Sequence, residues 1–144
     1  MTLVDTNILI YATSADAREH DRCRAWLEQQ LAEPDGLVSL CWPVIYSFTR
    51  LITNPRVFGS NSVSVQDGWE IVTALLNQSA VRIVTAGEGH KAIASQLAAT
   101  AGLRSDDVSD VEVAALAIEH GLVLATHDSG FRRFPGVRCF DPLA

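Results

Sequence analysis

The segment MTLVDTNILIYA, residues 1–12, decides how the rest of the chain is interpreted. Its apolar start, Thr2–Val4, predicts a short buried strand, and Asp5 and Asn7 follow before apolar residues resume at Ile8. A carboxylate at the end of a buried strand is costly to desolvate unless it is hydrogen-bonded or paired with a cation. Asp5 therefore has two interpretations, the N-cap of a following helix or one part of a cation-binding site.

Short apolar runs of this kind recur and alternate with helical patterns. Strands are predicted over residues 2–4, 37–40, 81–84, 122–125 and 137–140. Helices are predicted over residues 6–13, 16–33, 43–51, 66–78, 86–102 and 109–121, with a loop over 54–62 and Gly102 as a helix-ending residue. This alternation is typical of an α/β fold, a three-layer α/β/α sandwich with a mainly parallel central sheet.

Length and composition narrow the class of protein. A chain of 144 residues predicts a single domain, residues 1–144. We expect a cytoplasmic protein with no membrane association, because no apolar run reaches the length of a membrane span, no secretory signal is recognisable, and the three cysteines are scattered. The net charge of −6 argues against binding nucleic acid by bulk electrostatics, but ten arginines against one lysine allow a local basic patch.

A second carboxylate, Asp110, lies on an apolar helix stripe. Counting from Asp110, the residues at helical spacing are Val113, Ala114 and Ala117. Asp110 therefore points the same way as the face that packs on the sheet, and Asp107 shares this direction. The alternative is that these acids only cap the helix or interact with its dipole.

A third carboxylate, Asp128, lies three residues past the strand predicted over 122–125 and begins an Asp-Ser-Gly sequence that also fits an ordinary turn. Sites in parallel α/β sheets gather beyond the carboxyl ends of strands. We therefore expect Asp5, Asp110 and Asp128 to converge there. Clustered carboxylates raise one another's pKa unless a cation binds, and oxygen ligands favour Mg²⁺, with Mn²⁺ as an alternative. Such a cation can activate water for hydrolysis of a phosphodiester.

Four segments in this order resemble the PIN-domain family, and especially its VapC-type toxins. They are VDTNILIYA, FTRLITNPRVF, SDVEVAALAIEHG and LATHDSGFRRFPGV, and the resemblance extends from Val4 to Pro142. It implies a PIN-like α/β/α fold and a magnesium-dependent endoribonuclease. It also implies a homodimer held inactive by a cognate VapB-type antitoxin, whose C-terminal segment lies in a groove of the toxin. RNA is the implied substrate.

The resemblance assigns roles to individual residues. Asp5, Asp110 and Asp128 match the catalytic, metal-binding aspartates, and Asn7 and Thr126 match polar residues that orient ligands or substrate. One position departs from the family pattern, because Ser47 stands where a glutamate is usual. We hypothesise that Asp107 supplies the missing charge.

Other residues are weaker candidates. Arg50, one turn after Ser47, is a candidate for binding substrate phosphate, with a surface or antitoxin-pairing role as the alternative. Glu112 and Glu119 are expected to be solvated, and His127 to be a surface or capping residue, with an approach to the site as the alternative. Candidates for an RNA-facing rim, each with ordinary surface exposure as the alternative, are Arg56, Arg104, Arg132 and Arg133.

Two other functions compete with a nuclease. A PIN-like module that binds RNA or a partner without catalysis is favoured by Ser47. A phosphoacceptor receiver domain also places acids at strand ends, but it requires an aspartate after the middle strand and a late lysine. Thr85 follows the strand at 81–84, and no lysine comes after Lys91, so this alternative has little support.

Overall fold

A five-stranded parallel sheet forms the centre of the molecule. The computed structural model describes residues 1–35 and 38–144, so Gly36 and Leu37, predicted as the end of a turn and the start of a strand, lie outside the described residues. The strand order is β3-β2-β1-β4-β5, and each neighbouring pair is parallel. The strands are β1 (Thr2–Val4), β2 (Val38–Leu40), β3 (Val81–Ile83), β4 (Val123–Ala125) and β5 (Arg138–Phe140).

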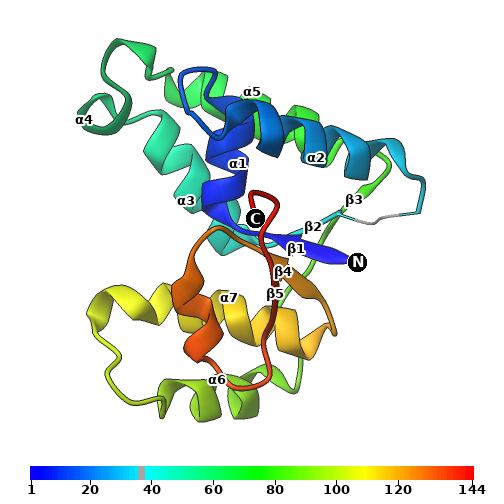
Figure 1. Ribbon diagram of the computed structural model, residues 1–144, viewed down its shortest axis with the longest axis vertical. Helices are drawn as coiled ribbons and strands as arrows, with labels where there is room; N and C mark the ends of the chain where they lie inside the picture. Colours follow the sequence, from blue (N-terminus) through cyan, green and yellow to red (C-terminus); the bar gives the residue numbers. More distant parts are fainter. Residues whose placement is uncertain (36–37) are drawn as a thin grey trace.

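Helices cover both faces of this sheet (Figure 1). One layer contains α1 (Thr6–Thr13), α2 (His20–Ala32), α3 (Trp42–Ile52), α4 (Pro55–Phe58) and α5 (Val65–Leu76), and the other contains α6 (His90–Ala98) and α7 (Val108–Glu119). Short 3₁₀ turns are η1 (Gly59–Asn61), η2 (Ser105–Asp107) and η3 (Ser129–Arg133). The predicted three-layer α/β/α sandwich is confirmed.

The connections between strands explain where a site can form. The chain moves from β1 to β2 to β3 through one helical layer, then returns through α6 and α7 to place β4 on the other side of β1. Right-handed crossovers require the helical layer to change when the direction of strand addition reverses. The reversal lies between β1 and β4, which pair through Thr2–Val123 and Val4–Ala125. Ligand sites in open parallel sheets lie at this switch point.

Three predictions of local structure need correction. Residues 54–62, predicted as a loop, form α4 and η1, because Asn54 accepts the Arg56 N–H as a helix cap and Pro55 suits the first helical turn. The helix predicted over 16–33 begins only at His20. The helix predicted to end at Gly102 ends at Ala98, and Gly102 adopts a positive φ in a later turn.

Small residues let two helices pack closely at positions that matter for the site. Ala114 and Ala117 on α7 are fully buried, so α7 lies near the sheet as its apolar stripe predicts. Gly68 on α5 packs against α3, where an added Cβ would lie 3.0 Å from Thr53 Cγ2. Among the helices of the described segments, none is long and apolar enough to cross a membrane.

Candidate active site

Asp5 occupies the turn between β1 and α1. Its backbone N–H donates to Ala125 O of β4 at 3.0 Å, and its Oδ1 accepts the Thr6 N–H at 2.7 Å. The residue is the N-cap of α1 and is only 8% exposed. The capping interpretation of Asp5 is therefore correct, but capping uses only Oδ1.

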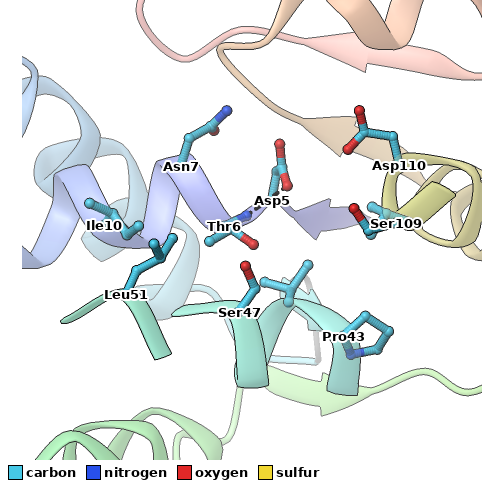
Figure 2. A pocket seen from close by; sticks show the side chains of 11 residues that line it. Asp5, Thr6, Asn7, Ile10, Pro43, Ser47, Leu51, Ser109 and Asp110 are labelled. Atoms are coloured by element: carbon cyan, nitrogen blue, oxygen red, sulfur yellow. Dashed lines mark hydrogen bonds between the residues drawn. The ribbon is translucent and has the colours of Figure 1, made fainter. Parts of the chain in front are cut away.

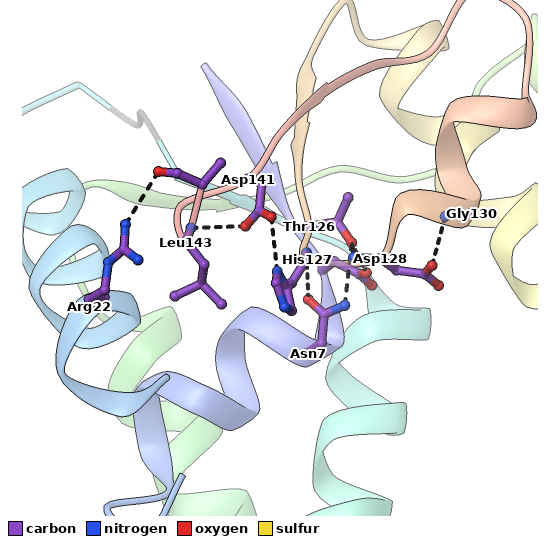
Figure 3. Close-up of polar contacts among 10 residues, drawn as sticks. Asn7, Arg22, Thr126, His127, Asp128, Gly130, Asp141 and Leu143 are labelled. Atoms are coloured by element: carbon purple, nitrogen blue, oxygen red, sulfur yellow. Dashed lines mark hydrogen bonds and ion pairs between the residues drawn. The ribbon is translucent and has the colours of Figure 1, made fainter. Parts of the chain in front are cut away.

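A threonine on the neighbouring strand end holds the other carboxylate oxygen of Asp5. Thr126 Oγ1 donates to Asp5 Oδ2 at 2.7 Å. Thr126 Oγ1 also accepts from Asn7 Nδ2 at 3.3 Å and from the Asp128 N–H at 3.0 Å. Asn7 Oδ1 in turn accepts the His127 N–H at 3.3 Å. Figure 3 shows how these contacts connect the start of α1 with the segment after β4. Asn7 and Thr126 therefore orient Asp5 and Asp128.

Asp5 and Asp110 line one cavity, of about 290 Å³. Figure 2 shows Asp110, in the first turn of α7, facing Asp5 across it. Its wall from α3 consists of residues spaced one turn apart, so a single face of that helix borders the cavity. The lining residues are Asp5, Thr6, Asn7, Ile10, Pro43, Val44, Ser47, Leu51, Ser109, Asp110 and Val113.

The electrostatics of this cavity favour a cation. Burial raises the pKa of Asp5, and repulsion from Asp128 adds to the effect, although hydrogen bonds from Thr126 and Thr6 oppose it. Burial, with repulsion from Asp128 and Asp5, raises the pKa of Asp110 to about 6 despite the nearby Arg133. Carboxylates that raise one another's pKa are those that a bound cation stabilises in the ionised form.

Asp128 is held in a different way from the other two acids. It is the N-cap of η3, and its Oδ1 accepts the Gly130 N–H at 2.8 Å, so the predicted turn is present. Its side chain borders a neighbouring cavity of about 80 Å³ rather than the one shared by Asp5 and Asp110. Asp128 therefore influences the main cavity through its charge and through its N–H bond to Thr126.

The residues present fit a partly hydrated divalent cation. Within residues 1–35 and 38–144, no three His, Cys, Asp or Glu side chains lie close enough together to hold a metal ion. Asp5 and Asp110 nevertheless face one cavity, and the charge of Asp5 helps to raise the pKa of Asp110. Mg²⁺ is usually bound through one or two carboxylates and keeps several waters, so this donor set suits it.

Ser47 faces the cavity from α3 (Figure 2). Ser47 therefore belongs to the cavity wall, and its hydroxyl adds no charge there. Asp107, expected to supply the missing charge, is not among the residues that line the cavity. Asp107 Oδ2 accepts the Arg104 N–H at 2.8 Å, and Oδ1 lies 3.0 Å from Arg133 Nη2. These contacts lower the pKa of Asp107 and occupy both of its oxygens.

The structure also places the weaker candidates. Arg50 is exposed and lies beside the α3 stripe that lines the cavity, not on it. Of the four rim candidates, Arg133 contacts the acids, since its Nη2 lies 3.4 Å from Asp110 Oδ2 as well as near Asp107. Sequence reasoning missed this contact because the pair joins η3 to α7, and no local spacing predicts it. Ser109 in the cavity wall was also missed.

Two predictions about titratable residues need comment. Glu119 is not solvated, because its side chain is 12% exposed and its Oε1 accepts the Gly87 N–H at 2.9 Å. The ring of His127 points to Asp141, with Nδ1 2.9 Å from Oδ2, so the backbone N–H of His127 and not its imidazole contacts the site residue Asn7 (Figure 3).

Comparison with known proteins agrees with this geometry. The PIN domain family model matches residues 2–137. The chain belongs to the PIN-domain family. It is 39% identical to ribonuclease VapC43 of Mycobacterium tuberculosis over 143 residues, 99% of this chain and 96% of the relative. It is 32% identical to ribonuclease VapC33 of the same organism, covering 99% of both chains.

Solved structures with lower identity share the fold of this PIN-domain chain. The VapBC2 structure from Rickettsia felis, bound to a DNA fragment from its promoter, has a TM-score of 0.72 at 17% identity and covers 97% of both chains. VapC20 of Mycobacterium tuberculosis, described as a sarcin-ricin loop cleaving toxin, has a TM-score of 0.65 at 18% identity, covering 96% of this chain and 99% of that one.

Proposed function

We propose that this PIN-domain protein is a magnesium-dependent endoribonuclease, the toxin of a toxin–antitoxin pair, acting in the cytoplasm as a single domain of residues 1–144. The observation that carries the proposal is the cavity at the β1–β4 switch point, where Asp5 and Asp110 face each other and experience the charge of Asp128. Whole-length identity to VapC ribonucleases supports the same activity.

Each residue of the cavity has a distinct part in this proposal. Asp5 and Asp110 would hold the cation, Mg²⁺ or Mn²⁺, with Asp128 supplying further negative charge from the neighbouring turn. The bound cation would polarise the scissile phosphate and lower the pKa of a water. Thr126 and Asn7 fix the orientation of Asp5, so that its carboxylate is positioned before substrate arrives.

An acidic protein can bind RNA at such a site because the cation supplies positive charge where the phosphate lies. Arg50 would contact substrate only away from the cavity, since it is exposed and lies beside the lining stripe. These residues do not select a particular RNA sequence or fold, so the proposal names RNA only as a substrate class.

Two cavities of this chain suit the proposed antitoxin partner. A cavity of about 420 Å³ between the end of α1 and the α3–α5 region contains Ile52, Phe58, Val63 and Ile71 in its lining and suits apolar side chains of a docked segment. The acidic cavity suits an arginine on that segment, which would pair with Asp5, Asp110 and Asp128 and exclude the cation. The solved relatives from Rickettsia felis and Salmonella typhimurium are VapBC complexes.

The homodimer in this proposal is supported by an exposed aromatic face on α3 and α5. Its rings are Trp42 (39% exposed), Tyr46 (62%) and Trp69 (39%), with centroids 6.2 Å and 6.0 Å apart in succession. Contiguous apolar surface of this kind marks a protein interface. We infer a second copy as the occupant, because the exposed Arg50 on α3 and Glu70 on α5 offer unlike charges that two copies of the chain can pair.

The decisive experiment is an RNA cleavage assay with the purified chain and its Asp5→Asn variant. We expect cleavage of structured RNA with Mg²⁺ or Mn²⁺, loss of cleavage on addition of a chelator, and no cleavage by Asp5→Asn. Cleavage that persists in the variant would indicate a different site or a contaminating nuclease.

A PIN-like binding module without catalysis is the second candidate function, and Ser47 in the cavity wall favours it. Metal titration separates the two candidates. RNA binding without cleavage at saturating Mn²⁺ would support the binding module and contradict the nuclease.

A further inference from the structure

Arg133 is the cationic side chain that reaches the acids of the cavity. It ends η3, five residues after Asp128, and extends to the start of α7. Its Nη2 lies 3.0 Å from Asp107 Oδ1 and 3.4 Å from Asp110 Oδ2. The guanidinium also lies over the ring of Phe134, 4.9 Å from its centroid, and Phe134 is 2% exposed. The orientation of the guanidinium is therefore set by a buried ring on one side and by carboxylates on another.

The two carboxylates hold Arg133 unequally. Asp107 makes the shorter contact and is itself fixed by the Arg104 N–H at 2.8 Å. Asp110 makes the longer contact and is also exposed to repulsion from Asp5 and Asp128. Asp107 can therefore keep Arg133 in place while Asp110 turns to another cation.

Arg133 has N–H donors beyond the one nitrogen that forms its ion pairs. Both ion pairs use the same nitrogen, Nη2, and the side chain is 33% exposed. A guanidinium has five N–H donors in a rigid fork that matches phosphate oxygens. Asp110, which Arg133 contacts through Nη2, lines the cavity, so the other N–H groups of Arg133 lie close to a carboxylate proposed to hold the cation.

We propose that Arg133 binds the scissile phosphate of the RNA, with Asp107 as the residue that positions it. Arg133 donates to a non-bridging phosphate oxygen, and Asp110 is left free to hold the cation. This inference rests on the proposed function and identifies the basic partner that the acidic chain needs at the phosphate. It assigns to Arg133 the role that sequence reasoning gave to Arg50.

The test compares Arg133→Gln and Arg133→Lys with Arg24→Gln as a matched control, since Arg24 forms an exposed ion pair with Glu28 on α2. We expect Arg133→Gln to lower kcat/KM for RNA cleavage by about 100-fold. Arg133→Lys should recover about a tenth of the activity, because lysine keeps the charge but not the fork. Arg24→Gln should cleave like the wild type.

A second readout excludes a merely structural role. Mn²⁺ affinity, measured by calorimetry without RNA, should be unchanged or about threefold tighter in Arg133→Gln, because a positive charge beside Asp110 is removed. If Mn²⁺ affinity and thermal stability fall together with cleavage, Arg133 only supports the fold and the inference is wrong.

RNA binding distinguishes failure of this inference from failure of the proposed function. Retention of a short single-stranded RNA is measured without a cation, so that binding is observed in the absence of cleavage. If the wild type cleaves and Arg133→Gln cleaves or binds equally well, the role of Arg133 is wrong and the nuclease stands. If the wild type neither cleaves nor binds RNA, both are wrong. If it binds without cleaving, weaker binding by Arg133→Gln still supports the phosphate contact.

Discussion

The hydroxyl of Thr126 donates a 2.7 Å hydrogen bond to Asp5 Oδ2, although the two residues are 121 positions apart in the chain. The bond joins the carboxyl ends of β1 and β4, where the order of strands reverses. Thr126 is 3% exposed and Asp5 is 8% exposed, so both partners are buried. The contact therefore links the stability of the sheet edge to the ionisation of the acid.

Thr126→Val tests this link. The substitution keeps the shape of the side chain but removes the donor to Asp5 and the acceptor for the Asp128 N–H. We expect a loss of about 1–3 kcal/mol in the free energy of unfolding at neutral pH, measured by urea denaturation. The pKa of Asp5 should rise further, since the hydrogen bond now opposes the effect of burial. Thr126→Ser keeps the hydroxyl and is the control; equal losses in both variants would contradict the prediction.

The pKa of Asp110 predicts how cation binding depends on pH. Because Asp110 titrates at about 6, the carboxylate that binds the cation is lost as the pH falls through this value. We expect Mn²⁺ affinity to be constant above about pH 7 and to decrease up to tenfold per pH unit below about pH 6. Calorimetry across this range is the measurement. An affinity that is constant down to pH 5 would show that Asp110 is not a ligand.

Folding stability without a cation should have the opposite pH dependence. The pKa of Asp110 in the folded protein lies above its ordinary value of 3.8, so protonation favours the folded state. The contribution of this group is complete below about pH 4 and is lost as the pH rises through about 6. Chelator-treated protein should therefore lose stability over this range, and Asp110→Asn should reduce the loss.

Ser47→Glu tests whether the cavity lacks a carboxylate. Ser47 lies in the cavity wall with Asp5 and Asp110, so a glutamate there adds a third acid to that wall. We expect at least tenfold tighter Mn²⁺ binding at pH 7.5, because ligand charge controls affinity for hard cations. Ser47→Gln has the same shape without the charge and should bind like the wild type. A glutamate variant that binds no better would place the cation away from α3.

Asp107→Asn separates positioning from metal binding. Both oxygens of Asp107 are engaged, by the Arg104 N–H and by Arg133. We expect Mn²⁺ affinity to remain within about twofold of the wild type, while RNA cleavage falls because Arg133 is less well held. A clear loss of Mn²⁺ affinity in this variant would restore Asp107 as the substitute for the missing glutamate.

The aromatic face of Trp42, Tyr46 and Trp69 predicts the assembly state. Tyr46→Ser combined with Trp69→Ser should shift the isolated chain from dimer to monomer in sedimentation equilibrium at micromolar concentration. Val57→Ser is the control, because Val57 is 52% exposed but lies on α4 rather than on α3 or α5, which carry the three rings. A wild type that is monomeric at all concentrations, or a dimer unaffected by the double change, would contradict the assignment.

Much of the fold was predictable because its signals are local. Short apolar runs predicted all five strands, and the stripe of Val113, Ala114 and Ala117 predicted the buried face of α7. Residues 54–62 were mispredicted because their polar and glycine content resembles a loop. The cap provided by Asn54 and the packing of Phe58 against the core stabilise a short helix there.

The sequence by itself determined which acids can meet, because parallel strands share one carboxyl edge and Asp5 and Asp128 each follow a strand. Only the tertiary structure decided how they meet. Asp5 and Asp110 share a cavity, whereas Asp128 accepts a hydrogen bond from the Gly130 N–H. The structure alone also paired Arg133 with Asp107 and Asp110. Strand ends follow from periodicity along the chain, but a contact between side chains depends on distances that only the packing of separate segments sets.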